Sequence, residues 1–97
     1  MHPLAEAFLI HNRVNTYFLE SISPEGWAVK VEKAKAVGAQ FAHMHNVRLM
    51  WLKAVDPTAL EGLAKLEDGS GADETKGALN ASAQAIAKVI DAAMASG

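Results

Sequence analysis

The sequence has no cysteine, no long uninterrupted apolar run and no strong excess of one charge. The absence of cysteine excludes disulfide bonds, thiolate metal ligands and a cysteine nucleophile, and it fits a reducing compartment. The predicted helices carry His, Arg, Asn or Lys every few residues, so none is expected to cross a bilayer. A net charge of −2, with Lys and Arg spread along the chain, provides no general attraction to phosphate. We therefore expect neither nucleic acid nor membrane as a partner.

The N-terminal segment MHPLAEAFLIHN lacks the basic start and the cleavage site of a signal peptide. A cytoplasmic location is therefore expected. The chain has 97 residues, of which 51% are apolar, and this is enough for one small domain with its own core. A single domain over residues 1–97 is the expected organisation.

Apolar residues recur at helical spacing in three segments, which predict long helices over 3–21, 35–55 and 73–95. A shorter amphipathic helix is predicted over 57–66, because Pro is favourable at the first position of a helix and Pro57 follows an Asp. Three long helices with short connections indicate an all-α, up-down helical bundle.

Each long helix has a predicted core face, derived from about 100° of rotation per residue. On the first helix this face holds Leu4, Phe8, His11, Val14, Asn15, Phe18 and Ile22. On the second it holds Val37, Phe41, Met44, Val47, Trp51 and Val55. On the last it is thin and rich in alanine, with Leu79, Ala83, Ile86, Ile90 and Ala93 or Met94.

Three polar residues interrupt these faces. His11 and Asn15 are four residues apart and are most simply a hydrogen-bonded pair, with a ligand or catalytic role as the alternative. Arg48 projects from the middle of the second face, and a buried guanidinium needs partners. We therefore predict that His11, Asn15 and Arg48 meet in one polar cluster inside the bundle.

The second long helix also carries two histidines, His43 and His45. On a helix they are separated by about 160° and cannot bind one metal together. His43 is expected on the flank of the core face, with His45 pointing roughly the opposite way. For His43, a structural role and a ligand role both stay open. The chain has no HxxxH pair, Ser-His-Asp arrangement, Gly-rich phosphate loop or paired carboxylates that would indicate a reaction.

From Phe8 to Ala95 the chain resembles the DinB/YfiT-like family of helical-bundle proteins. The resemblance rests on short pieces in their order and spacing, namely His11-Asn12-Arg13 with Asn15, then Val37-Gly38, Phe41-Ala42-His43-Met44, Asn46, Arg48 and Trp51-Leu52.

The resemblance implies a metal role for His43. Members of the family are typically four-helix bundles in which a histidine of the second helix joins two histidines of an HxxxH-type motif on the fourth. Three imidazoles with an open position suit Zn, Ni or a similar divalent ion. Some relatives use low-molecular-weight thiols in transfer or isomerisation reactions, so the implied chemistry is that of a metal-dependent transferase with an unassigned substrate.

The resemblance covers only the first three helices of such a bundle, because the sequence ends at Gly97. The fourth helix and its two histidines have no counterpart here. We therefore expect a shortened DinB-like domain with an incomplete metal site, in which His43 is the one ligand. Metal occupancy is expected to be weak or absent, and this polypeptide alone is not expected to catalyse a reaction.

The alternative function belongs to another class, a non-catalytic helical module that works by self-association, in which His43 serves only in packing. Three helices of a four-helix bundle leave a groove, predicted to be lined by parts of Phe8, Phe18, Phe41, Met44 and Trp51. An exposed groove of this kind is unfavourable, and two copies can cover each other across a two-fold axis. We therefore predict a homodimer.

Overall fold

Helices make up most of the residues that the computed structural model describes, which are 1–29 and 36–95, and no strand is found among them. The elements in chain order are α1 (Pro3–Glu20), α2 (Pro24–Trp27), α3 (Val37–Val55), the 3₁₀ helix η1 (Pro57–Leu60) and α4 (Ala72–Ala95). The predicted all-α bundle is confirmed, and the ends of the three long helices lie within two residues of the prediction. Residue 35, the predicted start of the second long helix, lies outside the described residues.

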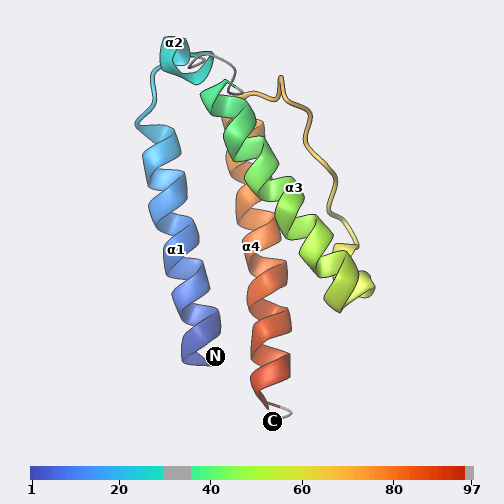
Figure 1. The fold of residues 1–97 in the computed structure, drawn as a ribbon. Coiled ribbons are helices and arrows are strands. Elements are labelled where there is room, and N and C mark those ends of the chain that lie inside the picture. Colours follow the sequence, from blue (N-terminus) through green and yellow to red (C-terminus); the bar gives the residue numbers. More distant parts are fainter. Residues whose placement is uncertain (30–35, 96–97) are drawn as a thin grey trace.

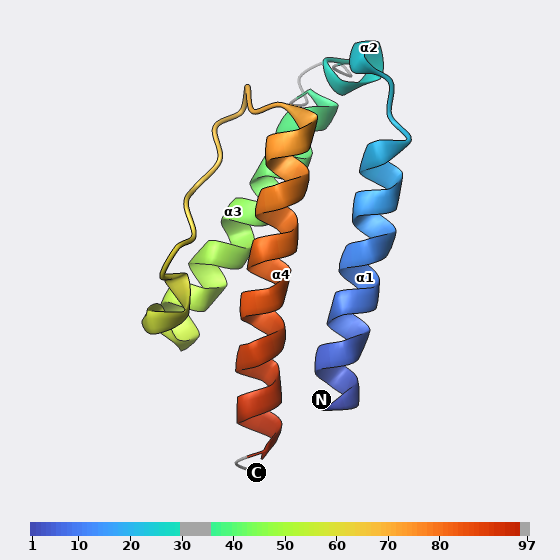
Figure 2. The ribbon, with the colours of Figure 1, turned by 180° about the vertical axis from the view of Figure 1, so that it is seen from behind.

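The long helices are arranged around α4, which packs against both α1 and α3. α4 passes behind α3 in Figure 1 and in front of it in Figure 2, and it lies beside α1 in both views. α1 and α3 do not pack closely against each other. The molecule is elongated, with extents of 45 × 22 × 22 Å. One face of the α1/α3 pair is therefore closed by α4, and the other has no long helix of the described residues over it.

The first helix begins at a cap that also ties it to the last helix. The Nδ1 atom of His2 accepts a hydrogen bond from the backbone N–H of Leu4 at 3.0 Å, which satisfies one of the free donors at the helix start. The backbone N–H of His2 donates to Oδ1 of Asp91 at 2.6 Å. This bond holds the start of α1 beside the end of α4, so the two helices run antiparallel (Figure 1).

The short helix α2 is held against α3 by Trp27. Its ring is stacked on Phe41 with 5.8 Å between the centroids, and its Nε1 donates to the carbonyl of Ser70 at 3.2 Å. Gly38 lies directly beneath the indole, and a Cβ atom there would overlap the ring. A glycine at position 38 is therefore required by the close approach of Trp27 to the α3 backbone.

The predicted helix over 57–66 is wrong beyond Leu60. The 3₁₀ helix ends there, and Gly62 adopts a φ of 80°, in the left-handed region that stops a helix. The chain then runs back along α3 toward the start of α4 (Figure 1). We call residues 61–67 the return segment.

The predicted core faces of α1 and α3 are also wrong in direction. The residues of α1 that are buried are Ala5, Asn12, Thr16 and Leu19. Those of α3 are Gly38, Ala39, Phe41, Ala42, His45, Arg48 and Leu52. Leu79, Ala83 and Ile86 of α4 are buried as predicted, whereas Ile90 is half-buried and Ala93 and Met94 are exposed.

The reason for this difference is the size of the packed side chains. α4 offers α1 and α3 a surface of small residues such as Ser82, Ala83 and Ala87, all of them almost fully buried. A small residue on the facing helix brings two backbones closest together, and close-packed atoms gain the most dispersion energy. α1 and α3 therefore turn several small or polar side chains toward α4, and many of their large apolar side chains lie elsewhere.

No helix within residues 1–29 and 36–95 is both long enough and apolar enough to cross a membrane. This agrees with the interrupted hydrophobicity of the sequence.

Candidate functional site

A groove lies between α1 and α3, with a volume of about 540 Å³. Its walls come from Asn15 and Phe18 of α1, from Ile22 just after α1, from Gly26 of α2, and from Val37, Phe41 and Met44 of α3. No residue of α4 lines it, so within the described chain it lies on the side of the α1/α3 pair away from α4. We call it the α1/α3 groove. Its volume is within the range of pockets that bind small molecules.

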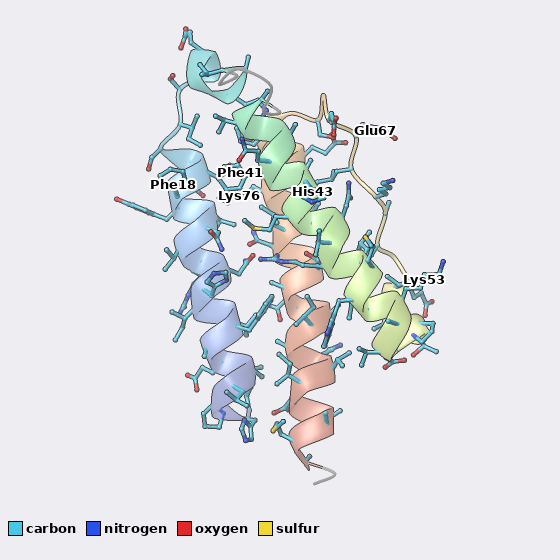
Figure 3. The ribbon with its side chains drawn as sticks, viewed as in Figure 1. Phe18, Phe41, His43, Lys53, Glu67 and Lys76 are labelled. Atoms are coloured by element: carbon cyan, nitrogen blue, oxygen red, sulfur yellow. The ribbon has the colours of Figure 1, made fainter. Side chains whose placement is uncertain are left out.

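The groove walls carry side chains that the sequence placed in the core. The rings of Phe18 and Phe41 lie 6.2 Å apart between the centroids, yet 61% of Phe18 is exposed. In Figure 3 these two side chains lie between the upper parts of α1 and α3. Trp51 is 42% exposed and lies about 20° from Met44 around α3, about two helical turns farther along the helix. The prediction of a groove with Phe18, Phe41 and Met44 is confirmed, although Phe8 and Trp51 do not line the cavity itself.

Arg48 connects the three long helices at a buried position. Its Nη1 atom donates to Oδ1 of Asn12 at 3.0 Å, to the carbonyl of Leu79 at 2.8 Å and to Oγ of Ser82 at 3.2 Å. All three acceptors are neutral groups. Burial lowers the pKa of the Arg48 guanidinium below its ordinary value, because desolvation disfavours the charged form. Arg nevertheless stays protonated in proteins, so the site holds a buried cation.

Phe8 of α1 also contacts this cation. The Cζ atom of Arg48 lies 5.1 Å from the centroid of the Phe8 ring, a distance at which the ring attracts the guanidinium. The Phe8 ring is in turn 6.2 Å from the ring of His11. Because the guanidinium of an α3 residue contacts both α1 and α4, it lies where the three long helices meet. Arg48 does not line the α1/α3 groove.

The predicted cluster of His11, Asn15 and Arg48 is wrong in its members. Nδ2 of Asn15 lies 3.3 Å from Nδ1 of His11 and donates to the His11 carbonyl at 3.2 Å, so the predicted hydrogen-bonded pair is confirmed. His11 is exposed, however, and the amide that meets Arg48 belongs to Asn12. Nδ2 of Asn12 also donates to Oδ1 of Asn80 at 2.9 Å. A rotation of α1 by about one residue, roughly 100°, accounts for the exchange.

The two histidines of α3 are placed the other way round from the prediction. His45 is fully buried, whereas His43 is exposed. In Figure 3, His43 lies farther from α1 than Phe41 does. The two residues still point in different directions around α3, as predicted. The buried side of the helix is the one that was wrong, because it includes Ala42 and His45 and excludes Val47. His43 therefore faces solvent and contributes nothing to the α1/α3 groove.

His45 and Asn46 fix the return segment, a role that sequence reasoning missed. Nε2 of His45 lies 2.8 Å from the carbonyl of Ala64. The side-chain amide of Asn46 donates to the carbonyl of Leu66 at 2.9 Å and accepts from its N–H at 2.8 Å. These bonds replace those that a continued helix would have made. Adjacent polar residues in an otherwise apolar helix were the only signal for this role.

No three side chains of His, Asp or Glu gather closely enough to hold a metal ion within the described parts of the chain. His43 could coordinate a metal there only with ligands supplied from outside these residues. The implied metal site is thus not assembled by the described residues.

Comparison with protein-family models, curated proteins and solved structures finds no match for this chain.

Proposed function

We propose that this chain is a self-associating helical module, in which two copies cover each other through the α1/α3 groove and its rims. One observation carries the proposal, namely that large apolar side chains of α1 and α3 face away from α4. Leu4 is 55% exposed, Phe18 61%, Val47 45% and Trp51 42%. All four lie on or beside the face that no helix covers.

The exposed area is large enough to matter. Taking about 200 Å² for an aromatic side chain and somewhat less for an aliphatic one, these four side chains expose of order 400 Å² of apolar surface. Covering that area contributes about 10 kcal/mol per chain at roughly 25 cal/mol per Å². Association costs about 4–15 kcal/mol in lost translational and rotational freedom. A surplus therefore remains when both chains bury this face.

A two-fold arrangement fits the geometry of the face. Stable interfaces bury about 800 Å² on each partner, and the same patch serves both copies of a two-fold dimer. With their open faces together, α1 and α3 of one copy and those of its partner form a four-helix layer. α4 of each copy then lies on the outside. Phe18 and Trp51 become buried without any change in the bundle.

The relationship to DinB-like proteins and a metal role for His43 stay predictions. The open face supports self-association without either of them. A homodimer is thus the proposal that draws on the structure itself.

Sedimentation equilibrium tests this function with two adjacent substitutions. Phe18→Asp places a charge in the groove, and Tyr17→Asp places the same charge on a neighbouring side chain that is 75% exposed and does not line the groove. We expect the wild type and Tyr17→Asp to sediment as dimers at tens of micromolar, and Phe18→Asp as a monomer. Far-ultraviolet circular dichroism checks that all three stay helical. A monomeric wild type, or a Phe18→Asp variant that remains dimeric, would contradict the proposal.

A further inference from the structure

A second groove, with a volume of about 520 Å³, lies between α1 and α4. We call it the α1/α4 groove. It differs from the α1/α3 groove in its chemistry, because most of the residues that line it are polar or charged. These are Glu6, Asn12 and Arg13 of α1 and Asn80 and Gln84 of α4. Its volume is within the range of small-molecule sites, and its walls favour a polar ligand.

The buried cation Arg48 fixes the direction of two amides in this groove. A guanidinium donates hydrogen bonds and cannot accept them, so Asn12 has to present its oxygen, Oδ1, to Nη1 of Arg48. Nδ2 of Asn12 is then directed to Asn80, whose Oδ1 accepts its hydrogen bond at 2.9 Å. Nδ2 of Asn80 remains, and it has no partner among the described residues. The groove is therefore lined by a hydrogen-bond donor at the end of a chain of bonds that starts at a cation.

Two opposite charges line the same groove. Arg13 follows Asn12 directly in the sequence, and Glu6 precedes Arg13 by seven residues. Arg13 and Glu6 are thus about 10 Å apart along the axis of α1 and within about 20° of each other around it. Both are exposed, and neither forms an ion pair with any described residue. The α1/α4 groove therefore has a free cation where Asn12 meets Asn80, and a free carboxylate about two helical turns away.

Gln84 lies between these two charges. Asn80 and Gln84 are four residues apart, so they share one side of α4 and are separated by about 6 Å along its axis. Because α1 and α4 are antiparallel, the step from Asn80 to Gln84 runs toward the start of α1, the direction in which Glu6 lies (Figure 1). The side-chain amide of Gln84 is exposed and has no partner among the described residues. A neutral amide thus separates a cation from an anion along the groove.

We propose that the α1/α4 groove binds a short peptide with free ends, about three residues long. The carboxylate of the peptide accepts hydrogen bonds from Nδ2 of Asn80 and from the guanidinium of Arg13. Its ammonium group pairs with the carboxylate of Glu6. Its peptide groups, each with one N–H and one C=O, match the donor and the acceptor of the Gln84 amide. Three extended residues span about 10 Å, which is the separation of Arg13 and Glu6 along α1.

This inference goes beyond self-association and does not depend on it. Among the described residues, none lines both the α1/α4 groove and the α1/α3 groove. Arg13 is separated from Phe18 by about 140° around α1, on a side of the helix that the proposed dimer does not use. The two proposals also have different readouts. Mass in sedimentation reports association, and the response to the charged ends of a peptide reports this site.

NMR spectroscopy of the isotope-labelled wild type at neutral pH tests the site with tri-alanine and two analogues. Tri-alanine amide lacks the carboxylate, and N-acetyl tri-alanine lacks the ammonium group. We expect tri-alanine to shift the side-chain amide signals of Asn80 and Gln84 and to bind about tenfold more tightly than either analogue. Free alanine cannot span the groove and should bind more weakly. An analogue or free alanine that binds as tightly as tri-alanine, or no shift at Asn80 with millimolar tri-alanine, would overturn the proposal.

A substitution of nearly the same shape tests the direction of the amide chain. Asn80→Asp keeps an oxygen that accepts from Nδ2 of Asn12, and it replaces the free donor with a negatively charged oxygen. Asn15→Asp makes the same change of charge at a residue that lines the α1/α3 groove instead. We expect Asn80→Asp to weaken tri-alanine binding by about tenfold, and Asn15→Asp to leave it within about twofold of the wild type. Unchanged binding to folded Asn80→Asp would refute the assigned donor.

Two further substitutions assign the ends of the peptide. Arg13→Gln removes the cation, and it should weaken the preference for tri-alanine over its amide while retaining the preference over N-acetyl tri-alanine. Glu6→Gln should have the reverse effect. Lys53→Gln removes a positive charge from an exposed residue of α3 that does not line the groove, and it should change neither preference. Circular dichroism checks that the variants stay helical. Both preferences surviving in folded Arg13→Gln or in folded Glu6→Gln would place that end of the peptide elsewhere and contradict the assignment.

Discussion

The two sides of the α1/α3 pair differ in the size of their side chains and in what covers them. The side against α4 is built partly from small or polar residues, such as Ala5, Asn12 and Ala42, and it is buried. The open side carries Phe18 and Trp51, and both are substantially exposed. The comparison teaches that large apolar side chains do not by themselves mark the face that packs within a chain. Close approach to an alanine-rich helix selects small residues, and large apolar residues are then available for other contacts.

The largest difference is expected between a buried leucine of α4 and an exposed leucine on the open side of α1. Leu79 of α4 is fully buried, and Leu79→Ala should lower the free energy of unfolding by about 3 kcal/mol, through lost burial and a residual cavity. Leu4 on α1 is 55% exposed, and Leu4→Ala should lower it by less than about 0.5 kcal/mol in the monomer. Urea unfolding at submicromolar protein measures both values. Equal losses for the two variants would mean that the open side is already covered.

A smaller difference is expected for two asparagines of α1. Asn12 is 4% exposed and accepts from Arg48, so Asn12→Ala leaves a buried cation with one acceptor fewer and should destabilise the fold by about 1–2 kcal/mol. Among the described residues Asn15 pairs with His11 alone, near the surface, and Asn15→Ala should cost less than about 0.5 kcal/mol. Chemical unfolding of the two variants side by side measures the contrast. If Asn15→Ala lowers the free energy of unfolding more than Asn12→Ala does, the result would support the predicted cluster of His11, Asn15 and Arg48.

The smallest effect is expected at His43. Its side chain is exposed, and no group of three candidate metal ligands forms within residues 1–29 and 36–95, so added Zn or Ni should be lost on dialysis. His43→Ala should leave both metal content and unfolding free energy unchanged. Elemental analysis after dialysis measures the metal. Stoichiometric metal that is retained by the wild type and lost in His43→Ala would show that His43 has ligands from a source outside the described residues.

Much of the fold was predictable from local patterns. Helical periodicity and the residues that end helices are short-range properties, and they placed the three long helices to within two residues. The direction of each core face was not predictable in the same way. Periodicity identifies the apolar side of a helix, whereas the packed side depends on the helix it meets. His45 and Asn12 were missed for this reason, because both lie outside the stripe of large apolar residues.

The candidate site was predicted in part. The groove and the aromatic pair Phe18 and Phe41 followed from the expectation that one face of the bundle is open. Burial of Arg48 followed from its position in an apolar stretch. Its partners on α1 and α4 did not follow, because three helices have to be placed in space before a side chain of one can be assigned acceptors on the others. The return segment was unpredictable in the same sense, since Asn46 acts on backbone twenty residues later.

The central claim is that a second copy covers this particular face, and fluorescence of Trp51 tests it most directly. Trp27→Phe removes the other tryptophan and leaves Trp51, which is 42% exposed on the same side of α3 as the groove residue Met44. Acrylamide quenching is measured from submicromolar to hundreds of micromolar protein, with mass followed by sedimentation. We expect Trp51 to become less accessible to acrylamide over the concentration range in which the mass doubles. Mass that doubles while the quenching of Trp51 stays constant would place the interface elsewhere and contradict the claim.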